Sequence, residues 1–366
     1  VMLPYSPLHH LLLHDFGGAL VATSANRRGE PVLTDNRQVE LHLGHVADTF
    51  LHHNRPILRP ADDPVYRIID QAPRPLRLGR GNAPLELTLP FALPQPLLAV
   101  GAHMKNSVAL AWENRCVISP HIGDLETPRS QDVFQQVIAD LQSLYAVQAA
   151  RVVCDAHPGY FSTHWAQRSG LPLQKVFHHM AHASALAGEF PAVGHWLVFT
   201  WDGVGYGQDG TLWGGEALLG KPGHWRRVAS LRPFRLPGGH KASREPWRSA
   251  LALCWEAGVP WPDGPRDNEL LFGAWKRGVN SPSTTSVGRL FDAAAALIGL
   301  TRTVSYEGQA PMQLEAIASA HAPAVTLPLA INTRQCWESD WSPLLAPLLD
   351  TRRSASERAG MLHHSL

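Results

Sequence analysis

The chain has 366 residues, a net charge of +1 and a hydrophobic fraction of 45%. This length predicts two or three domains with buried cores. The near-neutral charge argues against a nucleic-acid surface or a charged membrane-binding face. No signal peptide and no membrane-spanning run is recognisable, so we expect a cytoplasmic protein with neither nucleic acid nor membrane as a partner. The absence of a CxxC pair excludes a cysteine zinc ribbon and fits a reducing compartment; the cysteines are scattered, at Cys116, Cys154, Cys254 and Cys336.

The N-terminal region predicts a helix over residues 7–16, with leucines packing on a core, and a short strand over residues 19–23. Ser24 and Asn26 follow this strand. Hydroxyl and amide groups at the carboxyl end of a strand often line a ligand cleft in α/β proteins. Simple turn chemistry is the alternative for these two residues. Four prolines between residues 84 and 96 predict a linker, which would mark a domain boundary.

Strands and helices alternate in the region that follows. Strands are expected over residues 97–100, 108–112, 117–119 and 151–154, and helices over residues 130–145, 164–169 and 178–190. A glycine-bearing turn follows a first strand twice, at Gly101 and at Asp202. This repeat predicts a duplicated α/β domain with a nucleotide in its cleft. Lys105 in the first turn can meet a phosphate as a compact charge, although a hairpin with a solvated lysine is the simpler interpretation.

Residues 201–216 read WDGVGYGQDGTLWGGE, with six glycines and two Asp-Gly pairs. Glycines let the backbone approach a ligand closely. Their N–H groups can form a cradle for phosphate oxygens, and aspartates are suitable ligands for a cation. Two tight hairpin turns explain the same pattern equally well.

His178 and His182 are four residues apart, so a helix places both on one face. This arrangement suits two nitrogen ligands of one metal, and Asp202 is the candidate third ligand. His10 and His14 have the same spacing, but we interpret their helix as packing on a core. Two imidazoles and one carboxylate are an incomplete shell, which a ligand from elsewhere must complete. This mixed set does not distinguish between Fe and Zn.

A strong helix is predicted over residues 287–300, and Ser286 can cap it. Asp292 lies one turn in, where its carboxylate either accepts from ribose hydroxyls or complements the helix dipole. From residue 322 onward the pattern predicts only solvated helix and loop.

Long phrases of the chain, taken together, resemble the HypF family of hydrogenase maturation carbamoyltransferases. LPYSPLHHLLL, ATSANRRGEPV, HNRPILRPADDPV and RLGRGNAP resemble the YrdC-like domain of this family. GAHMKNSVAL, DAHPGY, HHMAHASA, DGVGYGQDGTLWGGE, SVGRLFDAAAALIGL and YEGQAPMQLE resemble its Kae1-like domain.

The resemblance implies an α/β fold class in two parts. A partial YrdC-like α/β domain over residues 1–92 is followed by a Kae1-like domain over residues 97–366. The latter is a duplicated α/β domain of the actin/Hsp70 (ASKHA) type. We expect truncation at both ends, because the family's acylphosphatase domain, zinc fingers, late glycine-rich phosphate segment and final metal-binding aspartate have no counterpart in the chain.

The resemblance also implies the chemistry. The YrdC-like domain makes carbamoyl-adenylate from ATP and carbamoyl phosphate. The Kae1-like domain passes the carbamoyl group to the C-terminal cysteine of HypE, where it becomes the precursor of a cyanide ligand of [NiFe]-hydrogenase. A divalent metal is expected, Fe or Zn, with Mg accompanying the nucleotide.

The site residues carried over by the resemblance fall into two sets, and no catalytic residue is assigned. The metal ligands are His178, His182 and Asp202. The nucleotide-binding residues are Ser24, Asn26, Lys105, Gly205, Gly207, Gly214, Gly215, Asp292 and Glu315.

Two other functions remain open at this point. A YrdC-like module beside a Kae1-like module also suits threonylcarbamoylation of tRNA, but that reaction needs a tRNA surface and the chain shows no basic stripe. The chain could instead be a non-catalytic fragment that retains nucleotide binding.

Overall fold

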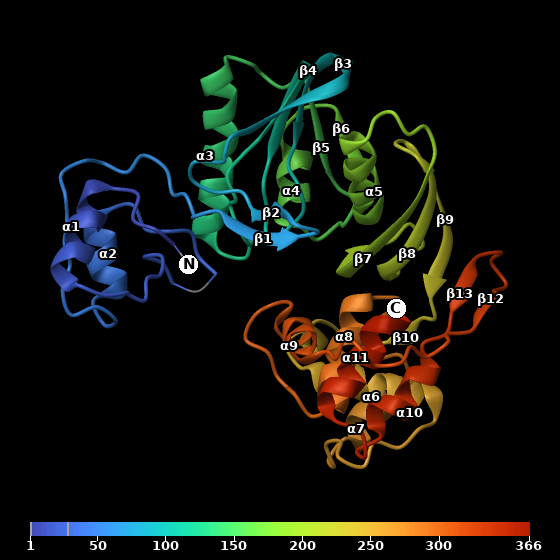
Figure 1. Ribbon diagram of the computed structural model, residues 1–366. Helices are drawn as coiled ribbons and strands as arrows, with labels where there is room; N and C mark the ends of the chain where they lie inside the picture. Colours follow the sequence, from blue (N-terminus) through green and yellow to red (C-terminus); the bar gives the residue numbers. More distant parts are fainter. Residues whose placement is uncertain (1, 28) are drawn as a thin grey trace. The chain divides into compact units, whose positions relative to one another are not determined.

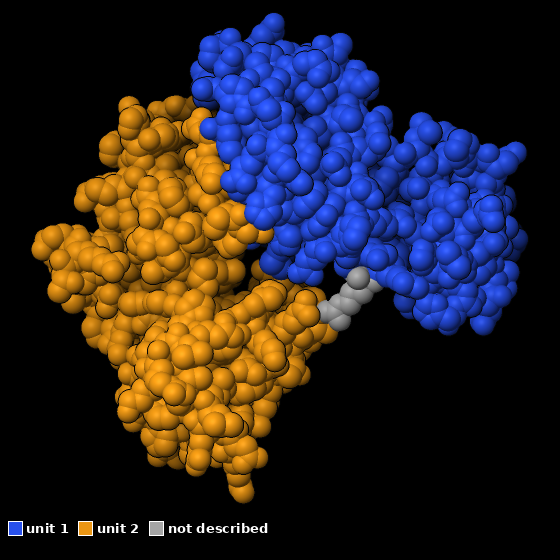
Figure 2. Space-filling model, turned by 180° about the vertical axis from the view of Figure 1, so that it is seen from behind, with its two compact units in different colours: residues 1–153, 160–173 blue, residues 154–159, 174–366 orange. Residues whose placement is uncertain are grey.

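The computed structural model describes residues 2–27 and 29–366, which form two compact units. Figure 2 shows unit 1, residues 1–153 and 160–173, in blue and unit 2, residues 154–159 and 174–366, in orange. Val1, the first residue of the predicted domain over residues 1–92, lies outside the described part. No helix within the described part has the length and apolarity that a membrane span requires.

Unit 1 begins with two short helices, α1 (Pro7–Phe16) and α2 (Asn36–Leu43). Helix α1 has the predicted bounds, because Ser6 caps its start and Gly17, in the left-handed region, ends it. Leu8, Leu11 and Leu12 lie at the surface and no residue of α1 is buried, so the predicted packing on a core is wrong for the described residues. The strand predicted over residues 19–23 does not form either.

The segment predicted as a linker is a long strand. A hairpin of β1 (Val65–Ile69) and β2 (Ala72–Arg77) precedes β3 (Leu85–Ala99), which pairs antiparallel with β4 (Ala109–Ile118). Register shifts interrupt this ladder between Thr88 and Leu93 and between Leu93 and Leu97. Pro90, Pro94 and Pro96 fall inside these interruptions, where the ladder needs no N–H donor. The two strands predicted over residues 108–119 are the single strand β4.

A four-stranded sheet in the order β4-β3-β5-β6 follows. It contains β5 (Arg151–Asp155) and β6 (Leu173–Val176), and β3 pairs with β5 in parallel. Helix α3 (Pro128–Tyr145) lies along the sheet (Figure 1) and α4 (Phe161–Arg168) follows β5. Phe134 of α3 is fully buried and makes edge-on ring contacts with Phe161 and Trp165 of α4. The alternation of elements agrees with the prediction for this region.

Unit 2 is built on a second sheet, in which β8 is the strand with the most neighbours. Its strands are β7 (Trp196–Tyr206), β8 (Leu212–Lys221), β9 (His224–Leu231), β10 (Phe234–Arg235), β11 (Ser283–Thr284), β12 (Leu329–Ile331) and β13 (Trp337–Ser339). The order is β10-β11-β8-β9-β13-β12, and β7 pairs antiparallel with β8. The predicted helix at the start of this unit is α5 (His178–Glu189).

Helix α8 (Val287–Leu297) is the centre of the helical core of unit 2, and its four alanines from Ala293 to Ala296 are buried. Around it stand η1 (Gly239–Ser243), α6 (Pro246–Ala257), α7 (Glu269–Lys276), α9 (Gln309–Ile317), η2 (Ser342–Leu344), α10 (Leu345–Leu349) and α11 (Ala355–Ser365). Trp341, Leu345 and Leu362 belong to the same buried cluster. The prediction of solvated structure beyond residue 322 is therefore wrong, because this segment closes the core over α8.

The mixed α/β architecture, with a sheet and covering helices in each unit, confirms the predicted fold class.

Candidate functional site

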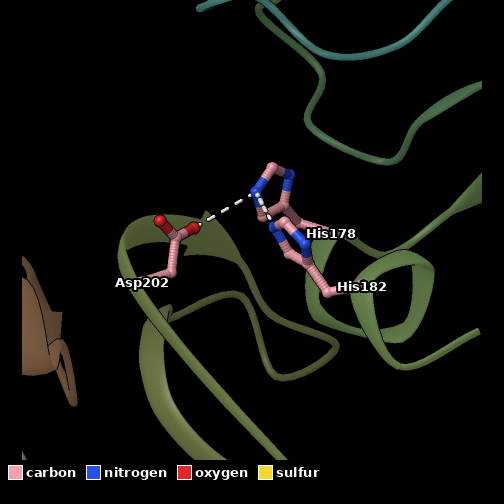
Figure 3. A group of neighbouring side chains, drawn as sticks. All are labelled: His178, His182 and Asp202. Atoms are coloured by element: carbon pink, nitrogen blue, oxygen red, sulfur yellow. Dashed lines mark hydrogen bonds and ion pairs between the residues drawn. The ribbon is translucent and has the colours of Figure 1, made fainter. Parts of the chain in front are cut away.

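The three predicted metal ligands lie together in unit 2 (Figure 3). Helix α5 places His178 and His182 one turn apart, and β7 carries Asp202 where its pairing register with β8 shifts, between Trp201 and Gly205. The Nε2 atoms of the two histidines are 3.2 Å apart, and Nε2 of His178 is 3.1 Å from Oδ2 of Asp202. All three potential ligand atoms lie within 4.8 Å of one another.

This geometry fits a single metal ion. Two imidazole nitrogens bound to one ion at about 2.1 Å lie about 3.0–3.4 Å apart, and the observed Nε2–Nε2 separation falls in that range. Asp155, at the end of β5, accepts a hydrogen bond from Nδ1 of His178 at 2.9 Å. The carboxylate thus leaves Nε2 of His178 for the ion, in the manner of an outer-sphere partner that orients a ligand.

The charges around the site favour a cation. Burial by itself lowers the pKa of His178, but hydrogen bonds to Asp155 and Asp202 raise it to about 9. Burial likewise raises the pKa of Asp202, yet its bond with His178 brings that pKa below its usual value. Burial, followed by the charge on His178, lowers the pKa of His182. A bound cation would therefore replace the proton that His178 otherwise holds between two carboxylates.

His179 is fully buried beside the cluster, and the sequence offered no signal for it beyond its place in a histidine pair. Neither ring nitrogen has a hydrogen-bond partner among the described residues, and burial lowers its pKa to about 4. A Cβ atom on Gly205 would stand 2.5 Å from Cε1 of His179 and 2.8 Å from Cδ2 of His178. Gly205 therefore leaves room for these two rings, a role that sequence reasoning missed.

The N–H groups of Gly214 and Gly215 already hold a buried anion. Both donate to Oε2 of Glu216, at 2.6 and 2.7 Å. The other oxygen of Glu216 accepts from Arg227 at 2.8 Å and from the hydroxyl of Thr285. Gly214, Gly215 and Glu216 all lie within β8, so these contacts are made inside one strand. The N–H donors are occupied by an internal carboxylate, so a role of these two glycines in nucleotide binding stays a prediction.

Gly207 also has a structural role, since a Cβ there would lie 2.1 Å from Nε1 of Trp213. Its N–H group donates to the carbonyl of Thr211 at 2.9 Å. The hairpin between β7 and β8 thus depends on this glycine for close packing.

A second buried charged group lies on α8. NH2 of Arg289 is 3.0 Å from Oδ2 of Asp292, and both side chains are almost fully buried. Burial raises the pKa of Asp292 to about 6; the charge on Glu307 adds to the rise and that on Arg289 opposes it. Nε and NH1 of Arg289 have no hydrogen-bond partner among the described residues. Buried ionisable groups with shifted pKa values are typical of functional sites.

The remaining predicted residues occupy separate places. In unit 1, Ser24 donates to Asn26, whose amide donates to the carbonyl of Glu30 at 2.8 Å, so these residues form a local turn. Lys105 is in the left-handed region, and its N–H group donates to Asp124 at 2.8 Å. In unit 2, Glu315 lies at the surface of α9, which packs against α8. Their part in nucleotide binding stays a prediction.

Three family models match the chain in succession. The first, described as "Telomere recombination" and covering Sua5, YciO and YrdC proteins, matches residues 1–79. The HypF Kae1-like domain matches residues 92–189, and the second subdomain of the carbamoyltransferase Kae1-like domain matches residues 198–366. The predicted YrdC-like and Kae1-like parts are thereby confirmed.

Two curated relatives match most or all of the chain, and their sequence identities to it are similar to each other. Carbamoyltransferase HypF of Synechocystis sp. is 40% identical over 392 residues, which is 100% of this chain and 51% of the relative. Carbamoyltransferase HypF of Rhodobacter capsulatus is 41% identical over 344 residues, 90% of this chain and 46% of the relative. The chain thus spans about half the length of the curated relatives it matches.

Solved structures agree with the sequence relatives. A full-length HypF in the phosphate- and nucleotide-bound form matches with a TM-score of 0.92 and 30% identity, over 100% of this chain and 59% of that chain. T. kodakarensis HypF matches with a TM-score of 0.86 and 28% identity, over 99% of this chain and 52% of that chain. On the family models, the relatives and the shared fold, this chain belongs to the HypF family.

Proposed function

We propose that this chain is part of a cytoplasmic, ATP-dependent carbamoyltransferase of [NiFe]-hydrogenase maturation. Residues 1–92 form the C-terminal part of a YrdC-like domain and residues 97–366 most of a Kae1-like domain. The change of family model between residues 79 and 92 supports this boundary. The observation that carries the proposal is the His178, His182 and Asp202 cluster, with Asp155 behind it, in a chain similar to a nucleotide-bound HypF.

The proposed reaction has three stages. Hydrolysis of carbamoyl phosphate by water first releases phosphate and carbamate. A carbamate oxygen then attacks the α-phosphorus of ATP, so that pyrophosphate leaves and carbamoyl-adenylate forms. The thiolate of the C-terminal cysteine of HypE then attacks the carbamoyl carbon, and AMP leaves as the C–S bond forms. The chain's near-neutral charge favours small-molecule and protein partners over tRNA.

His178, His182 and Asp202 would hold a divalent metal, Fe or Zn, which as a Lewis acid neutralises phosphate oxygens. Asp155 orients His178 through Nδ1. On α8, Asp292 would accept from the ribose hydroxyls, with Arg289 holding its carboxylate. In the YrdC-like part, Ser24 and Asn26 would line a separate nucleotide pocket. In the Kae1-like part, Lys105 would meet a phosphate and Glu315 the ribose, and Mg²⁺ would accompany ATP.

Metal binding tests the site directly. We expect the wild type to bind one Zn²⁺ or Fe²⁺ and His178→Ala/His182→Ala to bind none, because two of three ligands are lost. His10→Ala/His14→Ala is the matched control, since this pair has the same spacing on the exposed helix α1. The measurement is metal content after dialysis. Equal content in the wild type and the His178→Ala/His182→Ala variant would refute the site.

Pyrophosphate exchange tests the chemistry, in a protein of the length of its HypF relatives. We expect carbamoyl phosphate, and not threonine with bicarbonate, to drive the exchange of labelled pyrophosphate into ATP. Exchange driven by threonine would indicate the tRNA-modifying alternative. Binding of ATP without any exchange would indicate a non-catalytic nucleotide-binding protein.

A further inference from the structure

Ser286 joins the metal cluster to helix α8. Its side chain is completely buried. Its hydroxyl lies 3.0 Å from the carbonyl oxygen of Asp202 and 2.5 Å from that of Gly203, and it donates to this pair of carbonyls. The same oxygen accepts the N–H group of Arg289 at 3.0 Å, which caps α8. One hydroxyl therefore contacts both a predicted metal ligand and the helix that carries Asp292.

The main chain approaches this hydroxyl closely because glycines leave the space. A Cβ atom on Gly214 would stand 2.7 Å from the carbonyl oxygen of Asp202 and 2.9 Å from Cα of Ser286. A Cβ atom on Gly288 would stand 2.8 Å from Cα of Gly203. The irregular part of β7 is thus built against the first turn of α8, and nothing larger than glycine fits between them.

The interrupted pairing of β7 with β8 explains why a side-chain donor is needed at Asp202 and Gly203. Regular pairing of β7 with β8 breaks off between Trp201 and Gly205, so the carbonyls of Asp202 and Gly203 lie where the ladder is interrupted. A partly buried carbonyl that strand pairing leaves open needs another donor. Ser286 supplies one and thereby fixes the main chain of Asp202.

The position of this main chain sets the direction of the carboxylate. Oδ1 of Asp202 accepts the N–H group of Gly203 at 2.6 Å, which leaves Oδ2 directed at Nε2 of His178, 3.1 Å away. We infer that Ser286 is a positioning residue for the metal centre: it holds the turn of Asp202 against α8 and so presents Oδ2 to the metal. This inference rests on the proposed metal site.

An ordinary helix cap is the competing explanation, and the chain offers a matched control for it. Ser354 caps α11 in the same way, with its hydroxyl oxygen accepting the N–H group of Glu357 at 3.1 Å. Glycine is almost as good a capping residue as serine, whereas alanine is poor. Ser286→Gly therefore removes the hydroxyl and leaves most of the capping preference, and Ser354→Gly does the same far from the cluster in sequence.

The experiment compares wild type, Ser286→Gly and Ser354→Gly by Zn²⁺ affinity against a competing chelator, and by hydrogen exchange of peptides covering residues 199–206. We expect Ser286→Gly to weaken Zn²⁺ binding about 10-fold, the lower end of the usual effect of outer-sphere partners. We also expect faster exchange in that segment without added metal. Ser354→Gly should change neither quantity.

Zn²⁺ affinity and exchange in Ser286→Gly that both equal the wild-type values would overturn the inference, as would an equal loss of affinity in Ser354→Gly. A wild type that binds neither Zn²⁺ nor Fe²⁺ would refute the proposed metal site and, with it, the positioning of a ligand. Exchange would still show whether Ser286 holds the turn, so the two failures can be told apart.

Discussion

The two larger sheets of the molecule begin with long strands that differ in their surroundings. Over residues 97–99, strand β3 pairs on both edges, antiparallel with β4 and parallel with β5. Strand β7 pairs with β8 alone within the described residues. Leu98 on β3 is 1% exposed, whereas Leu197 and Phe199 on β7 are 54% and 63% exposed. A central strand buries its apolar side chains, while an edge strand leaves hydrogen-bonding groups and apolar surface uncovered.

The two units also differ in the charged side chains that they bury. Among the described residues, every charged side chain classed as buried belongs to unit 2: Asp155, Glu216, Arg289, Asp292 and Arg358. Burying such groups costs free energy unless they are paired, so a fold retains them where function or a network requires them. The candidate metal ligands therefore lie in the unit that buries charged groups.

The largest difference in stability is expected from truncating one leucine on β3 and one on β7. We expect Leu98→Ala to lower the free energy of unfolding by about 2–5 kcal/mol, because it leaves a cavity in a packed core. Leu197→Ala should cost less than about 1 kcal/mol, as is usual at exposed positions. Urea unfolding of both variants gives the comparison. Equal losses would mean that β7 is covered in solution.

The buried charge of Asp292 should be visible in the pH dependence of stability. Its pKa of about 6 in the folded chain exceeds the usual 3.8, so the folded state holds the proton more tightly than the unfolded state. Stability from this group is complete below pH 3.8 and is lost as the pH rises to about 6. The unfolding free energy of the wild type, relative to Asp292→Asn, should fall by about 3 kcal/mol across this window.

Asp340→Asn provides the control of opposite sign. Burial raises the pKa of Asp340, but hydrogen bonds from Ser342 and Arg232 outweigh it and bring the pKa below its usual value. The wild type should therefore gain stability relative to Asp340→Asn as the pH rises through the acid range. A flat difference for Asp292→Asn would show that its carboxyl is not held in a buried environment.

The smallest effect on stability is expected from the exposed face of β7. We expect the chain to self-associate through this face, and Leu197→Thr/Phe199→Thr to reduce the mass seen by light scattering with little change in Tm. Leu270→Thr/Val279→Thr is the control, because these residues are 93% and 57% exposed elsewhere in unit 2.

A chain of the length of the relatives should bind metal and nucleotide more tightly than the 366-residue chain and scatter less light. A monodisperse 366-residue chain with equal affinity would contradict this expectation.

Several features were determined by local sequence. Helices α1, α3 and α8 were predictable because their capping residues and residue spacing are local features of the sequence. Helix α5 was predictable from its residue spacing alone, because no side chain caps its start. The proximity of His178 and His182 in the candidate metal site was predictable, since an i, i+4 pair on a helix always shares a face. Ser286 was predictable as a helix cap, although not as a contact of Asp202.

Only the tertiary structure decided the rest. The prolines of β3 are tolerated because its partner β4 leaves register interruptions opposite them. The oxygens of Glu216 meet donors from β8, β9 and the segment before α8, which no local pattern relates. Beyond residue 322, Trp341, Leu345 and Leu362 are buried because they share one apolar cluster with α8. Propensity and periodicity act over a few residues, whereas burial and the pairing of buried polar groups depend on contacts between segments far apart in the chain.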